Sequence, residues 1–219
     1  MSADHRLMPR KNLTTFFVLL VTQTVSLIGS RMTSMAMGIW IYTETGKAAP
    51  LLLASFFAEL PGMLVGSFAG ALVDRWPRKA VMILSDAGQA LGSLLLLLSF
   101  ASGQFQPWHL YVVSLLQGLF GTFQGPARDA TTTLLIPADR RERLNAVIEL
   151  SFPLASTIAP VLAGLLYGLI GVTGVILIDL GTFLLAVLVV AGQSIPQPPP
   201  SEEGAEGRGQ FLSEALGGL

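Results

Sequence analysis

The stretch that decides the fold is residues 51–101, which read LLLASFFAELPGMLVGSFAGALVDRWPRKAVMILSDAGQALGSLLLLLSFA. Two long apolar runs lie on either side of a short charged turn. A helix needs about 20 mostly apolar residues to cross about 30 Å of hydrocarbon, and both runs are long enough. The runs are continuous and do not alternate between apolar and polar residues, which favours helices over barrel strands. This stretch therefore predicts two membrane-spanning helices joined by a polar turn.

The rest of the chain has the same character. Of its 219 residues 52% are hydrophobic and 12% are charged, with a mean hydropathy of +0.64, whereas soluble domains carry about 25% charged residues. The first apolar segment is longer than the core of a signal peptide, so we interpret it as retained. We predict an all-α membrane protein with six transmembrane helices, at residues 13–42, 51–73, 80–101, 108 to at least 125, 146–169 and 172–191.

The orientation of these helices follows from their flanking charges. Nearly all Lys and Arg residues fall on one side of the predicted membrane, and Lys47 alone falls on the other. The basic residues of the first side are Arg6, Arg10, Lys11, Arg75, Arg78, Lys79, Arg128, Arg140, Arg141, Arg143 and Arg208. By the positive-inside rule we expect a multi-pass protein of the cell membrane with both termini cytoplasmic.

The composition changes sharply near residue 193. Residues 1–192 form the predicted helical bundle, and residues 193–219 are rich in Pro, Glu and Gly. Such a tail cannot bury enough apolar area to fold alone, so we expect a cytoplasmic linker. We interpret it as the start of a truncated interdomain linker.

Several function classes are excluded by what the sequence lacks. It has no Cys and only two His, so thiol catalysis, a Ser-His pair within the membrane and a histidine metal site are not expected. It contains no phosphate-binding G-x-x-x-x-G-K-[ST] loop and no broad basic face for nucleic acid. We expect no enzyme, cofactor or metal, and an electrochemical gradient as the source of energy.

The charged turn fits the pattern G-x-L-x-D-R-x-x-R-[RK]. The matching residues are Gly70, Leu72, Asp74, Arg75, Arg78 and Lys79. The turn resembles the signature loop of the major facilitator superfamily, which lies between the second and third of twelve helices; Pro77 departs from it, since many members have Gly there. The resemblance implies that this chain is the N-terminal six-helix half of such a transporter. Its partner would be a second half, either a missing C-terminal part or another chain.

The same resemblance implies that the turn is a gating loop. Asp74 could pair with Arg78 or with the positive end of a helix from the other half, and such contacts would bias alternating access. We predict that Asp86, Arg128 and Glu149 join this salt-bridge network. In the alternative, the basic residues only set the topology and hold lipid head groups.

Residues 155–164, ASTIAPVLAG, resemble the antiporter motif G-x-x-x-G-P-x-x-G-G of the same superfamily. Pro160 and Gly164 are retained, whereas Ala155, Ala159 and Ala163 replace glycines. This resemblance implies proton exchange, but ordinary packing of small residues is an alternative. Residues 124–147 resemble the macrolide-efflux branch, although Ser114 stands where many drug exporters have Arg.

Three charged residues lie within the predicted spans and away from their cytoplasmic ends, where an unpaired charge is costly. Arg31, Glu59 and Asp179 fall at comparable depths and form the candidate proton and substrate site. In the alternative, Arg31 and Glu59 form a static ion pair. We expect a proton-coupled exporter of amphipathic drugs or other small molecules, with protons, membrane lipid and this substrate as its partners. Proton-coupled nutrient uptake and a non-transporting membrane scaffold are the alternatives.

Overall fold

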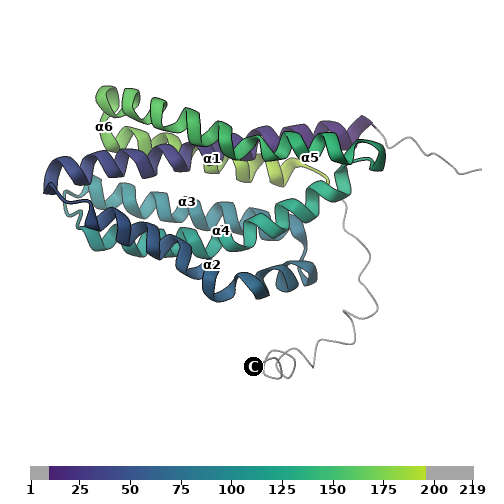
Figure 1. The fold of residues 1–219 in the computed structure, drawn as a ribbon, viewed down its shortest axis with the longest axis horizontal. Coiled ribbons are helices and arrows are strands. Elements are labelled where there is room, and N and C mark those ends of the chain that lie inside the picture. Colours follow the sequence, from purple (N-terminus) through teal and green to yellow (C-terminus); the bar gives the residue numbers. More distant parts are fainter. Residues whose placement is uncertain (1–9, 196–219) are drawn as a thin grey trace, which may run out of the picture.

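The computed structural model describes residues 10–195 as a bundle of long helices (Figure 1). The elements are α1 (Arg10–Thr45), α2 (Ala49–Arg75), α3 (Arg78–Ala101), α4 (Pro107–Leu135), the 3-10 helix η1 (Ala138–Arg140), α5 (Arg141–Glu149) and α6 (Ser151–Gly192). The described residues contain no strand, which confirms the all-α prediction. Most of the predicted tail, residues 196–219, and residues 1–9 lie outside the described part of the chain.

Four helical stretches of the described chain are long and apolar enough to cross a membrane. They are Leu13–Thr45, Ala49–Arg75, Arg78–Ala101 and Ala138–Gly192. The predicted fourth span is a single helix, α4, but it does not reach this apolarity. The number of crossings therefore stays a prediction.

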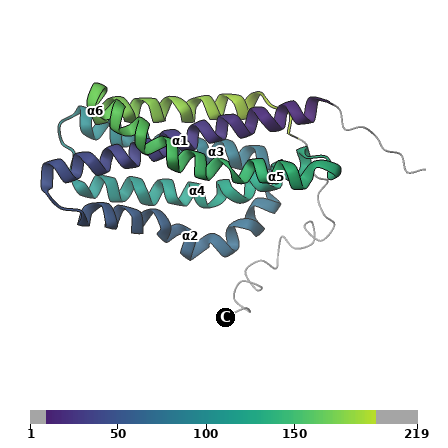
Figure 2. The same cartoon turned by 45° about the horizontal axis from the view of Figure 1, so that its top comes forward.

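Helix α6 contains the predicted fifth and sixth spans. Its 42 residues would measure about 63 Å as one straight helix, roughly twice the hydrocarbon thickness. The helix is broken at Gly171, where φ is 68° and ψ is −179°, values that favour glycine. Figures 1 and 2 show the chain reversing its direction there, so residues 151–170 and 172–192 run as two antiparallel arms.

The turn between α2 and α3 is set by a proline. Trp76 precedes Pro77 and has an extended backbone, because the proline ring disfavours the helical region for the residue before it. The next helix begins directly at Arg78. The predicted polar turn at this position is therefore confirmed as a sharp break between two apolar helices.

Two boundaries differ from the prediction. Arg128 was expected between helices, but α4 continues through Pro126 to Leu135 and so contains Arg128. The fifth span was expected from residue 146, but α5 ends at Glu149 and α6 begins at Ser151. A single proline inside a long helix removes one backbone donor without ending the helix when neighbours support it.

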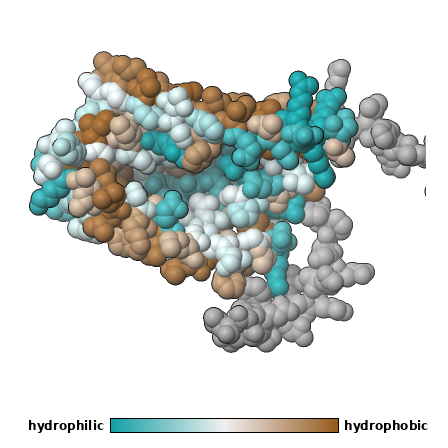
Figure 3. Space-filling view, viewed as in Figure 1, coloured by the Kyte–Doolittle hydropathy of each residue, from teal (hydrophilic) through white to brown (hydrophobic). Residues whose placement is uncertain are grey.

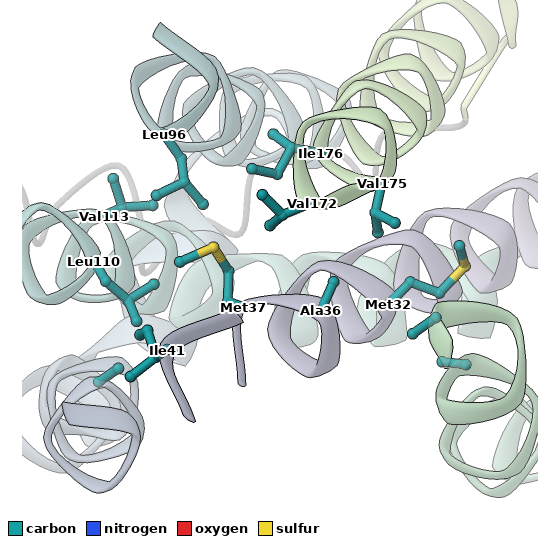
Figure 4. Packing of buried hydrophobic residues seen from close by; sticks show 13 residues of the cluster. Met32, Ala36, Met37, Ile41, Leu96, Leu110, Val113, Val172, Val175 and Ile176 are labelled. Carbon is teal, nitrogen blue, oxygen red and sulfur yellow. The ribbon is translucent and has the colours of Figure 1, made fainter. Parts of the chain in front are cut away.

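The core lies where α1, α3, α4 and α6 meet. Figure 4 shows Met37 of α1 pointing toward Leu96 of α3 and Val172 of α6, all within one buried apolar cluster. A second cluster, which includes Phe16, Met82 and Leu135, packs the other end of the bundle. Helix α2 packs mainly on α4, at the edge of the bundle (Figure 2).

Two glycines allow close helix approach. A Cβ at Gly29 of α1 would lie 2.5 Å from the Thr182 hydroxyl oxygen and 3.1 Å from a carboxylate oxygen of Asp179 on α6. A Cβ at Gly118 of α4 would overlap the backbone carbonyl of Ala58 on α2. Small residues at such crossings are typical of membrane helix packing, since they let the backbones approach.

Candidate functional site

A cavity of about 640 Å³ opens among α1, α2, α4 and α6. Figure 3 shows hydrophilic residues in a band across the middle of this face, with hydrophobic residues above and below. Apolar side chains line the cavity together with one cation, Arg31, and one anion, Glu59. Hydroxyl groups also line it, from Ser30, Ser34, Ser55, Ser114 and Ser156. The volume and the mixed lining are those of a small-molecule site, for which 300–1,000 Å³ is usual.

Arg31 and Glu59 share the cavity wall but do not pair. The ion pairs of the described residues within 4.0 Å do not include a contact between them. The Arg31 guanidinium carbon instead lies 4.1 Å from the centroid of the Phe152 ring, and its buried Nε has no hydrogen-bond partner. The static ion pair considered from the sequence is therefore absent, and both charges remain available to a ligand.

Asp179 lies behind the cavity wall. It is fully buried on α6, and its carboxylate accepts hydrogen bonds from Ser93 at 2.7 Å and Ser30 at 3.2 Å. Ser30 also lines the cavity, so one hydroxyl separates Asp179 from it. The structure thus brings the predicted trio to one region, with two members on the cavity and the third in the packed interior.

Two basic residues of the charged turn bind backbone carbonyls toward the C-terminal ends of α4 and α6. Arg78 donates a hydrogen bond to the Ala130 carbonyl oxygen at 2.9 Å. Lys79 donates to the carbonyl oxygens of Ala191 at 2.6 Å and Gln193 at 2.9 Å, at the end of α6. Cations beside terminal carbonyls complement the helix dipole. These two residues therefore fasten α3 to α4 and α6.

The rest of the turn faces outward. The Asp74 side chain is 70% exposed and lies 4.0 Å from the Arg78 guanidinium, at the limit of an ion pair. Leu72 is half-buried, and Arg75 is exposed. A Cβ placed on Gly70 would meet no atom of another described helix within 4 Å, so Gly70 does not mark a close helix contact among residues 10–195. Asp74 is the acidic group of the turn that remains open to a partner.

The predicted salt-bridge network around the turn is not formed. Asp86 is fully buried and accepts hydrogen bonds from Gln23 and Gln124, so it has no contact with the turn. Arg128 pairs with its neighbour Asp129 at 3.4 Å. Glu149 is the exposed last residue of α5 and is absent from the ion pairs of the described chain. Each of the three residues belongs to a different environment.

The family of the chain follows from comparison with known proteins. The family model described as Major Facilitator Superfamily matches residues 19–217. The chain belongs to this superfamily. Its relatives in the superfamily include transporters named for efflux and export, and these are membrane proteins rather than enzymes.

Three of these superfamily relatives show how far the similarity extends. Macrolide efflux protein A of Streptococcus pyogenes is 31% identical over 83% of this chain and 45% of its own length. The protein of the same name from Enterococcus faecalis is 28% identical over 68% of this chain and 46% of its own length. Enterobactin exporter EntS of Escherichia coli O1:K1 / APEC is 29% identical over 67% of this chain and 35% of its own length. The chain thus matches about half the length of these superfamily members, or less.

The segment that resembles the superfamily's antiporter motif lies on the first arm of α6. Ala155, Ala159 and Ala163 are fully buried, and the last two belong to the apolar core. Pro160 is exposed and lines the cavity, whereas Gly164 has open space around it. The small residues therefore pack α6 into the bundle while Pro160 faces the cavity. Their role in proton exchange stays a prediction.

Four amide side chains of the bundle were not predicted from the sequence as functional residues. Gln23 on α1, Gln89 on α3 and Gln124 on α4 bind one another or the Asp86 carboxylate. Gln117 on α4 donates to the Ser93 hydroxyl and to the backbone oxygen of Gln89. The available signal was the occurrence of glutamine inside apolar helices, where a polar group must find a partner. That signal indicates pairing but does not identify the partners.

Proposed function

We propose that this chain is half of a secondary transporter that exports amphipathic small molecules in exchange for protons. The observation that carries the proposal is the cavity, which combines apolar walls and hydroxyl groups with an unpaired Arg31 and Glu59. Such a lining accepts a ligand with an apolar body and a few polar or charged groups. The names of the relatives, a macrolide efflux protein and an enterobactin exporter, favour outward transport.

The proposed mechanism is alternating access around this cavity. In the proposal a second six-helix half covers the hydrophilic face of Figure 3, and the two halves rock about the bound substrate. Asp74 is placed to contact that half, since its carboxylate is exposed at the end of α2. Glu59 on the cavity wall and Asp179 behind Ser30 are the proposed proton carriers.

A transport assay tests this function. Inverted membrane vesicles from cells expressing the full coding sequence should accumulate a macrolide when a proton gradient is imposed, and an uncoupler should abolish the accumulation. Glu59→Gln should remove it, because the substitution keeps the shape of the side chain but removes its charge and its proton. Glu149→Gln is the matched control, since Glu149 lies outside the cavity at the end of α5.

Three outcomes would contradict the proposal. Substrate movement in the opposite direction would indicate uptake. A chain that moves no substrate under any gradient would instead fit a membrane scaffold. Full activity in Glu59→Gln would remove this residue from the proposed site.

The proposed topology has six crossings and both termini in the cytoplasm. Because the sequence contains no Cys, single cysteines can report the location of each loop. Lys47→Cys and Gln104→Cys should react with a membrane-impermeant maleimide in intact cells, whereas Arg140→Cys should react only after permeabilisation. The reverse labelling pattern would invert the orientation, and labelling of Arg140→Cys in intact cells would rule out the proposed arrangement.

A further inference from the structure

A hydrogen-bonded group surrounds Asp86 between α1, α3 and α4. The Gln124 amide donates to one carboxylate oxygen of Asp86 and, at 3.0 Å, to the Gln23 side-chain oxygen. The Gln23 amide donates to the other carboxylate oxygen of Asp86 at 2.9 Å. The Gln89 amide donates to the Gln124 side-chain oxygen at 2.6 Å. Three helices therefore converge on one carboxylate.

The same chain of groups continues to Asp179. The Gln117 amide donates to the backbone oxygen of Gln89 at 3.3 Å and to the Ser93 hydroxyl oxygen at 3.1 Å. Ser93 in turn donates to Asp179 at 2.7 Å. The Gln117 amide thus donates in two directions: toward Asp179 through Ser93, and to the backbone of Gln89, whose side chain leads through Gln124 to Asp86. Both carboxylates are acceptors, and the amides around Asp86 are the donors of its branch.

Among the described side chains, no cation contacts Asp86 to balance its charge. The carboxylate is fully buried, and it accepts hydrogen bonds from two neutral amides, those of Gln23 and Gln124. On its own helix, Arg78 binds the Ala130 oxygen and Lys79 binds the end of α6. A buried carboxylate that is bound only by neutral donors is costly, because amides offset only part of the lost hydration.

The described side chains of the helices packed around Asp86 supply no counter-charge either. On α4, Arg128 lies one helical turn beyond Gln124 and pairs with Asp129. On α1, Arg31 lies over the Phe152 ring. On α6, Asp179 is the facing titratable group, and it is bound to Ser30 and Ser93. Because no described cation contacts Asp86, its charge can be neutralised by binding a proton.

A small cavity lies beside this group. It has a volume of about 20 Å³, which is room for one water molecule, and Gln23, Arg128, Thr131 and Ser151 contribute polar atoms to its wall. Gln23 touches both this cavity and Asp86. A water molecule there would be separated from the carboxylate by a single side chain.

We propose that Asp86 is a proton-binding site of the chain, distinct from the transport cavity, and that Gln23 and Gln124 transmit its protonation to α1 and α4. The proton adds to one carboxylate oxygen and changes the group from −1 to neutral. The new O–H must donate, but both neighbouring amides now present N–H groups to Asp86. One amide must therefore turn and present its oxygen, which breaks its present hydrogen bond to Asp86. This inference goes beyond the proposed export, because it concerns proton binding in the absence of substrate.

Infrared difference spectroscopy of the full chain in lipid nanodiscs tests the proposal. A pH step should produce the C=O stretch of a protonated carboxyl group, and Asp86→Asn should remove one such band. Asp179→Asn should leave that band in place, as should Asp74→Asn, which alters an exposed carboxylate. A wild-type spectrum without a carboxyl band, or one unchanged by Asp86→Asn, would overturn the proposal.

Gln124→Leu gives a second, independent readout that keeps Asp86. Loss of one donor should shift the Asp86 band to higher frequency, since hydrogen bonding weakens the C=O bond. Gln117→Leu is the matched control, because it removes an amide of the Asp179 branch and should leave the Asp86 band unshifted. If Asp86→Asn does not fold, the Gln124→Leu spectrum decides, and an unshifted band there would overturn the proposal.

Discussion

Helix α1 contributes polar side chains to two different regions: the open cavity, and the buried hydrogen-bonded groups around Asp86 and Asp179. Arg31 and Ser34 line the open cavity, and the Arg31 Nε has no hydrogen-bond partner. Gln23 and Ser30 donate to buried carboxylates. An unpaired polar group can gain energy from a ligand, whereas a paired buried group stabilises the fold and is costly to break. We therefore expect cavity variants to alter binding and buried variants to alter stability.

The largest effect is expected where the backbones of α2 and α4 touch. Gly118→Ala should lower the free energy of unfolding by about 2–3 kcal/mol, because its Cβ would overlap the Ala58 carbonyl, which belongs to a residue of the cavity wall. Gly121→Ala on the same helix is the matched control, since its Cβ would have open space. Thermal unfolding of the purified proteins measures the difference. Equal melting temperatures would show that this crossing does not hold the cavity together.

The next largest loss of stability is expected in the buried hydrogen-bonded group around Asp86. Gln124→Leu should cost roughly 1–3 kcal/mol, because it leaves Asp86 and the Gln89 amide each without one partner. Macrolide affinity should stay within twofold of wild type, since Gln124 is absent from the cavity lining. Chemical denaturation and equilibrium binding on the same preparation check both parts. A variant of normal stability would show that the amide group does not stabilise the bundle.

At the cavity wall we expect the opposite: a loss of binding with little loss of stability. Arg31→Met should weaken macrolide binding about tenfold, which corresponds to about 1.4 kcal/mol, through loss of a donor on the cavity wall. Stability should fall by less than about 1 kcal/mol, since no ion pair of the described residues involves Arg31 and the contact with the Phe152 ring is the one lost. Arg128→Met is the matched control, as Arg128 pairs with Asp129 and lies outside the cavity. If Arg31→Met lowers stability but leaves binding unchanged, Arg31 stabilises the fold and does not bind the substrate.

The smallest effect is expected at the turn between α2 and α3. Lys79→Met should cost about 0.5–1 kcal/mol, because it removes the donor to the last carbonyls of α6. Its unfolding temperature should fall slightly below that of Asp74→Asn, which alters an exposed side chain. If the two variants unfold at the same temperature, the basic residues of the turn do not fasten α6.

The sequence predicted the helices well because apolar length is a strong local signal. Uninterrupted apolar runs identified every long helix, and Trp76 followed by Pro77 marked the break before α3. The end of α4 was harder to predict, because Pro126 and Arg128 suggested a loop. Contacts with neighbouring helices keep this segment helical despite the lost donor.

The site was predicted only in part, for a geometric reason. Depth along a helix follows from residue count, and it placed Arg31 and Glu59 in one region. Their pairing depends on how each helix is rotated about its axis, which packing decides. The same limit hid the partners of Asp86, since nothing local to Gln23 or Gln124 indicates that they meet.

The most direct measurement is macrolide binding and thermal unfolding compared across the two regions in the same purified protein. We expect Arg31→Met and Glu59→Gln to weaken binding about tenfold with little change in unfolding temperature. We expect Gln124→Leu to lower the unfolding temperature without a change in binding. The reverse pattern, with weaker binding in Gln124→Leu and normal binding in both cavity variants, would contradict the assignment of the cavity as the substrate site.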